Sequence, residues 1–77
     1  MARQPAVEAR VRGFMALAVD MVRVDADRRP SPEMAGWYRE LADAAGLDAV
    51  PVRTNRELFQ EGLRVARAVN LEATPAV

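Results

Sequence analysis

The chain has 77 residues, with 11 Arg, 11 acidic side chains and a formal net charge of zero, and it contains no Cys, His or Lys. These counts exclude thiol and imidazole catalysts, disulfides and Schiff-base lysines, together with the usual zinc and haem ligands. The neutral balance also lacks the basic field of a dedicated nucleic-acid binder, and 51% hydrophobic residues favour a folded domain over disorder. We therefore expect one small helical domain over residues 1–77, with no cofactor and no metal.

The distribution of apolar residues gives no sign of a membrane segment. The longest apolar run, Gly13–Val19, stops at Asp20, well short of the roughly 18 uncharged residues that a spanning helix needs. Arg3 is not followed by the continuous apolar stretch and cleavage site of a secretory signal. A cytoplasmic location is expected, and the use of Arg for every basic residue indicates a GC-rich bacterial genome.

Residues 5–23 have the pattern of an amphipathic helix. Pro5 suits a first helical position, and Glu8 lies four residues before Arg12, the spacing of a helical ion pair. At 100° per residue the apolar side chains cover an arc of about 200°. They are Val7, Val11, Phe14, Met15, Leu17, Ala18, Val19, Met21 and Val22. Since a surface helix needs a stripe of only about 100°, this helix is predicted to contact more than one neighbour.

Residues 24–31 have no periodicity and are predicted to be a loop that leads into a second helix over residues 32–45. Ser31 is placed to cap this helix, and Gly46 supplies the left-handed residue that ends it. Its apolar face consists of Met34, Trp37, Tyr38, Leu41, Ala42 and Ala45. Because Trp37 and Tyr38 are adjacent, they point about 100° apart, and one of them is expected at the edge of the core.

Residues 46–54 are predicted to be a connector, because Pro51 interrupts a short extended stretch. Thr54 and Glu57 have the spacing of a capping box, so a third helix is expected over residues 55–70, followed by a tail at 71–77. The predicted fold is all-α without significant sheet. It is a three-helix small domain in which the long first helix packs on the pair formed by the other two.

The segment Arg39–Leu47, with the sequence RELADAAGL, resembles the first helix and turn of a helix-turn-helix DNA-binding motif. Ala42 and Gly46, four residues apart, match the small residue and the turn glycine of that family, and Val52 falls near a core position of its next helix. The alternative function implied by this resemblance is a small dimeric DNA-binding regulator or antitoxin.

In that family the helix after the turn enters the major groove and contacts bases. The matching positions here are Asp48–Arg56, so the resemblance implies that Arg53 and Arg56 are the candidate nucleic-acid contacts. Pro51 lies in the middle of this segment and opposes a helix there. The conformation of Asp48–Arg56 therefore discriminates between the two classes of function.

Carboxylates are the only acid–base groups available, and the densest loop cluster is Asp25 with Asp27. Two Asp at this spacing suit a hard cation, but the further oxygen donors and closing Glu of a calcium loop are absent, so a solvated charged loop is the simpler interpretation. Ser31, the only serine, suits a helix cap better than a carrier site. We do not expect an enzyme.

With catalytic chemistry excluded, the leading hypothesis is a non-catalytic protein–protein interaction or assembly module. The pattern predicts a core with few large apolar side chains, and the first helix has a wider apolar arc than a monomer needs. We therefore expect a homodimer or higher oligomer, or a small accessory subunit docked on a larger protein, rather than a partner that is a nucleic acid or a membrane. The expected partner-binding residues are Leu17, Val19, Met21, Trp37 and Tyr38.

Overall fold

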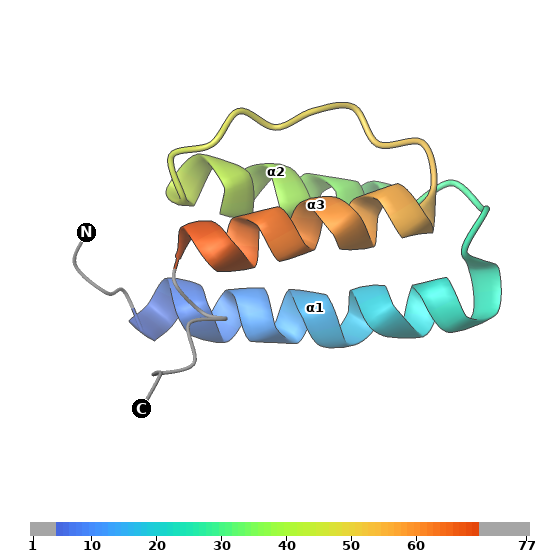
Figure 1. The fold of residues 1–77 in the computed structure, drawn as a ribbon, viewed down its shortest axis with the longest axis horizontal. Coiled ribbons are helices and arrows are strands. Elements are labelled where there is room, and N and C mark those ends of the chain that lie inside the picture. The colour runs from blue at the N-terminus through green and yellow to red at the C-terminus, as the bar shows by residue number, and fades with distance from the viewer. Residues whose placement is uncertain (1–4, 70–77) are drawn as a thin grey trace.

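The computed structural model describes residues 5–69, which form three helices and two connections (Figure 1). α1 spans Pro5–Asp25, α2 spans Pro32–Ala44 and α3 spans Asn55–Ala68, and no strand occurs among the described residues. α1 runs opposite to both α2 and α3, so α2 and α3 are parallel and the connector between them returns along the whole bundle (Figure 1). The predicted all-α, three-helix fold is confirmed, and α1 packs on both other helices.

The helix ends differ from the predicted ends by one or two residues. α1 continues to Asp25 rather than residue 23, because the Asp25 carbonyl oxygen accepts hydrogen bonds from the Arg28 amide at 3.0 Å and from Asn55 Nδ2 at 2.9 Å. α2 ends one residue before the predicted end and α3 two residues before it. Residue 70 and the predicted tail at 71–77 lie outside the described part of the chain.

Both predicted N-terminal caps are present. The Ser31 hydroxyl accepts from the Met34 amide at 3.2 Å, and the Thr54 hydroxyl accepts from the Glu57 amide at 3.1 Å. The Glu57 carboxylate reaches back to the amide of Arg53 at 2.6 Å, one residue earlier than in an ideal capping box. The caps bind helix-terminal amides that would otherwise lack partners, and so they determine where α2 and α3 begin.

Gly46 ends α2 through a pair of hydrogen bonds that requires a left-handed residue. Its φ is +75°, its amide donates to the Asp43 carbonyl at 3.0 Å, and the next amide, that of Leu47, donates to the Ala42 carbonyl at 2.8 Å. This is the Schellman arrangement, and the Leu47 side chain packs against the core as that arrangement favours.

The core lies where the apolar faces of the three helices meet. The buried side chains are Val11, Phe14 and Ala18 of α1, Met34, Tyr38, Leu41 and Ala42 of α2, and Leu58, Val65 and Ala66 of α3. Phe14 is 1% exposed, and its ring meets that of Trp37 edge to face with centroids 5.5 Å apart. Phe14 therefore joins the core to the boundary between α1 and α2.

α1 and α3 make the most extensive contact of the three helix pairs, and a glycine allows it. Gly62 of α3 is buried against α1. A Cβ at this position would lie 2.8 Å from Cε2 of Phe14 and 2.6 Å from Sδ of Met15. Only a hydrogen atom fits at this position on Cα of Gly62. Any other residue type would require α1 to move.

The first connection is bound to the start of α3. The Arg28 carbonyl accepts from the Asn55 amide at 2.8 Å, and the Ala26 carbonyl accepts from the Arg56 amide at 3.0 Å. Together with the Thr54 cap, these bonds satisfy the first amides of α3. The loop between α1 and α2 therefore also serves as a cap for α3.

Within residues 5–69, no helix combines the length and the apolar content required to cross a lipid bilayer.

Candidate protein-interaction surface

The five residues expected to bind a partner differ in their exposure. Leu17 is 47% exposed, which is among the highest values for a large apolar side chain in this part of the protein. Val19, Met21 and Trp37 are half-buried. Tyr38 is 1% exposed, so its side chain belongs to the core and is not accessible to a partner. Of the adjacent residues Trp37 and Tyr38, Tyr38 therefore lies in the centre of the core and Trp37 at its edge.

The apolar residues of α1 do not form one patch. Leu17 and Val19 are two residues apart, and at 100° per residue their side chains point about 160° apart around the helix. Met21 lines a separate hollow near the first connection, together with Asn55 and Ser31. The structure therefore separates Val19 from Leu17, whereas Met21, four residues after Leu17, lies on the same side of α1 as Leu17 and is half-buried.

Tyr38 has a structural task that explains its burial. Its hydroxyl donates to Oε1 of Glu61 on α3 at 3.2 Å and accepts from the amide of Val50 in the connector at 2.9 Å. The ring packs between the helices while the hydroxyl is fully bonded, as buried tyrosines require. Tyr38 thus links α2, α3 and the extended connector at one point.

Arg64 extends this network toward the connector. Its Nε donates to Oε1 of Glu61 at 2.9 Å and its Nη2 donates to the carbonyl of Asp48 at 3.0 Å. The hydrogen bond to Glu61, followed by that to Tyr38, raises the pKa of Arg64 above its ordinary value. The guanidinium therefore stays charged and fixes both the carboxylate and the connector.

Replacing Tyr38 by Phe is expected to lower the free energy of unfolding by about 1–2 kcal/mol, because the partly buried Val50 amide loses its acceptor while the ring remains. Urea unfolding measures the loss, and hydrogen exchange at the Val50 amide locates it. We expect the Val50 amide to exchange faster in the variant. The relative exchange rates of the amides in the middle of α1 should not change. Unchanged exchange at Val50 would show that Tyr38 does not bind the connector.

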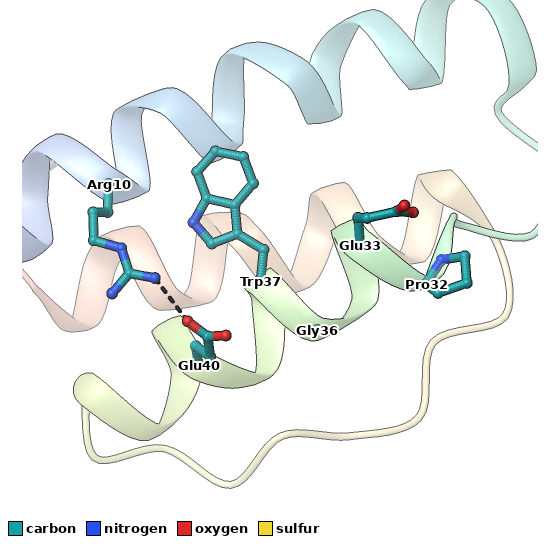
Figure 2. Close-up of a pocket in the computed structure, with 6 residues that line it drawn as sticks. All are labelled: Arg10, Pro32, Glu33, Gly36, Trp37 and Glu40. Carbon is teal, nitrogen blue, oxygen red and sulfur yellow. Dashed lines mark hydrogen bonds and ion pairs between the residues drawn. The ribbon is translucent and has the colours of Figure 1, made fainter.

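Trp37 lies in a hollow between α1 and α2 (Figure 2). The hollow has a volume of about 470 Å³ and is lined by Arg10, Pro32, Glu33, Gly36, Trp37 and Glu40. The indole stands on α2 and points toward α1, and an ion pair of 2.8 Å between Arg10 and Glu40 bridges the helices beside it (Figure 2). Both charged side chains are more than half exposed, so this pair adds little stability.

Gly13 forms the α1 side of the same region. A Cβ at Gly13 would lie 3.6 Å from Cη2 of Trp37, so this exposed glycine is in contact range of the indole. Leu17 follows Gly13 by four residues and Val24 follows Leu17 by seven, which places all three on one side of α1. Val24 is 70% exposed. The exposed apolar residues on this side of α1 thus extend from beside Trp37 to the end of the helix, with the exposed Asp20 between Leu17 and Val24.

Sequence reasoning missed Val24, Gly13 and Arg10 as members of this surface. The sequence pattern ends the first helix at residue 23 and so predicts Val24 in the loop, whereas α1 includes Val24. Gly13 carries no side chain to mark a face. The sequence contains one signal for this surface: Val24 lies two heptads after Arg10 and one heptad after Leu17, so the three residues share one side of a helix.

The segment that the helix-turn-helix resemblance needs is not helical. Residues 47–53 form an extended connector, and α3 begins only at Asn55. Pro51 lies within this connector, Arg53 donates its amide to Glu57, and Arg56 forms an ion pair with Asp27 of the first connection. No recognition helix therefore presents Arg53 and Arg56 together, and the DNA-binding interpretation loses its structural basis.

Among residues 5–69, no group of three or more acidic side chains is arranged to hold a metal ion. No protein-family model, curated protein or solved structure matches the chain.

Proposed function

We propose that this protein is a non-catalytic protein–protein interaction module whose partner packs on the exposed side of α1. The observation that carries the proposal is the apolar exposure along one side of that helix, where Leu17 is 47% and Val24 70% exposed. Removing apolar surface from water favours association by about 25 cal/mol per Å² before the entropic cost of binding is subtracted. Exposed apolar side chains in a row on one helix face are typical of an interaction surface.

Trp37 supports the same surface from the α2 side. Its indole is half-buried beside Gly13, and its N–H has no hydrogen-bond partner among the described residues. Tryptophan is enriched at the energetic centres of protein interfaces, where a rigid apolar ring and one donor act together. Gly13 adds an open position at which a partner helix can approach closely.

Three acidic side chains of the described residues have structural roles, and these roles support a non-catalytic function. Asp27 pairs with Arg56, Glu61 pairs with Arg64, and Glu57 caps α3. Each of these three carboxylates has a structural partner and none is fully buried, whereas burial is the usual way in which the pKa of a carboxyl is raised for general acid catalysis. The cytoplasm remains the proposed compartment, because small secreted domains usually depend on disulfides and this chain has no Cys.

The test compares Leu17→Glu with Gln60→Glu. Both add one negative charge at an exposed helical position, the first on the proposed surface of α1 and the second on α3. We expect both variants to keep the circular dichroism of the unmodified protein. Leu17→Glu is expected to abolish association, measured as solution mass by light scattering and as co-purification with a tagged chain, and Gln60→Glu to leave it unchanged.

The proposal fails if Leu17→Glu keeps both the solution mass and the co-purifying proteins of the unmodified chain. It also fails if the unmodified protein neither self-associates nor retains any protein that Leu17→Glu releases. Since Leu17 is a surface residue, loss of folding in Leu17→Glu is detected by circular dichroism and separated from loss of binding.

A further inference from the structure

Six exposed positions on α1 follow the spacing of a coiled-coil seam. They are Ala6, Arg10, Gly13, Leu17, Asp20 and Val24, with intervals of four, three, four, three and four residues. This alternation is the a/d pattern of a heptad repeat, which places all six on one stripe of the helix. We refer to these six residues as the α1 seam.

The seam is self-complementary in residue size and in charge. Counting outward from residue 15, Gly13 is matched by Leu17, Arg10 by Asp20 and Ala6 by Val24. Each match therefore combines a small residue with a larger apolar one, or a positive charge with a negative one. A helix with this arrangement is complementary to a second copy of itself in the antiparallel direction, where a positions face d positions.

We propose that the partner of this protein is a second copy of the chain, whose α1 packs antiparallel on the α1 seam about a two-fold axis near residue 15. This proposal rests on the interaction function proposed above and names its partner. Leu17 of each copy fills the space over Gly13 of the other, and Arg10 of each pairs with Asp20 of the other. Val24 of each copy covers Ala6 of the other.

The charges of Arg10 and Asp20 favour antiparallel over parallel packing of the two α1 helices. In a parallel pair in register, Arg10 would face Arg10 and Asp20 would face Asp20, and both contacts would be repulsive. In the antiparallel pair both contacts become attractive. Asp20 is exposed and has no ion pair among the described residues, so it is available for this contact. Arg10 already bonds Glu40 through one guanidinium nitrogen and retains other N–H donors.

Trp37 lies where the proposed dimer contact is closest. Leu17 of the second copy would lie over Gly13, and Cη2 of Trp37 is 3.6 Å from the place where a Gly13 Cβ would be. The incoming leucine would therefore contact both the Gly13 backbone and the edge of the indole. A large apolar residue inserted between a glycine and a tryptophan is the kind of contact that concentrates binding energy in interfaces.

Charge reversal tests the partner, the direction and the register together. Arg10→Glu and Asp20→Arg should each weaken the dimer by about tenfold or more, because each variant places two like-charge contacts in the homodimer. The double variant R10E/D20R should restore the dissociation constant to within about threefold of the original. An equimolar mixture of the two single variants should form a heterodimer, because one chain then carries both acidic groups and the other both basic groups.

Glu40→Gln is the matched control, because it removes the partner of Arg10 on α2 without changing the seam. It should leave the dimer dissociation constant unchanged, which separates the dimer contact from the ion pair within one chain. Sedimentation equilibrium measures all of these constants, with circular dichroism as the check on folding.

A dimer that the single reversals do not weaken, or that the double reversal does not restore, overturns the antiparallel register. An unmodified protein that stays monomeric at all concentrations overturns the second copy as partner. In that case the Leu17→Glu co-purification experiment still decides the broader interaction function, since a different protein on the same surface would still be lost in Leu17→Glu. The two proposals therefore fail separately.

Discussion

Replacing Phe14 by Ala is expected to lower the free energy of unfolding by about 3–5 kcal/mol, the usual cost of truncating a buried aromatic side chain. Phe14 is 1% exposed, meets Trp37 edge to face, and lies against the Gly62 position of α3. At roughly 0.05–0.15 kcal/mol per residue, a domain of this size has only about 4–12 kcal/mol of stability in total. The variant is therefore expected to lose from about a quarter to all of the stability of the domain.

Val50→Ala is the control for Phe14→Ala, because Val50 is 41% exposed and lies outside the α1 seam. We expect it to change the free energy of unfolding by less than about 0.5 kcal/mol. Urea unfolding followed by circular dichroism, at one fixed protein concentration because dimerisation adds to apparent stability, gives both values. A loss below 1 kcal/mol in Phe14→Ala would mean that the core is not centred on this ring.

Replacing Gly62 by Ala is expected to lower the free energy of unfolding by about 1–3 kcal/mol, although Ala is the better helix former. The added Cβ would lie 2.8 Å from Cε2 of Phe14, which is held by the core, and 2.6 Å from Sδ of Met15. The Met15 thioether is flexible and can move aside, but the Phe14 ring cannot do so without shifting α1. Overpacking therefore outweighs the gain in helix propensity.

Gly36→Ala makes the same change in the interior of α2 and is expected to have the opposite sign. A Cβ at Gly36 would have only Nη2 of Arg39 within reach, at 3.8 Å, which is an ordinary contact. The variant should be more stable by about 0.5–1 kcal/mol, because Ala loses less conformational entropy than Gly in a helix. If Gly62→Ala were also stabilising, α1 and α3 would not approach as closely as the structure shows.

The fold was predictable because its boundaries depend on local chemistry. Ser31, Thr54 and Gly46 act through bonds to amides and carbonyls within five residues of themselves, and such bonds can be inferred from spacing alone. The end of α1 was not predictable in the same way. Asp25 is held in part by the Asn55 side chain, which lies 30 residues further along the chain.

The candidate surface was predicted only in part, for a geometrical reason. The apolar arc of α1 is wide because it includes two edges of the helix, and the sequence does not show which edge another helix covers. Leu17 and Trp37 remained accessible, whereas Val19 points away from Leu17. The sequence predicts Tyr38 as a partner-binding residue, but its hydroxyl bonds Glu61 and the Val50 amide, and these partners are distant in sequence and cannot be inferred from spacing.

The parallel arrangement of α2 and α3 has a consequence for how the molecule folds. Helices joined by a short turn pack as a hairpin as soon as both exist, but here the main partner of α1 is α3, the last of the three helices in residues 5–69. The contacts that close the core therefore span most of the sequence, a topology associated with slower folding than that of a simple helical hairpin. During synthesis α1 and α2 emerge first, and we expect them to acquire their final packing only after α3 has left the ribosome.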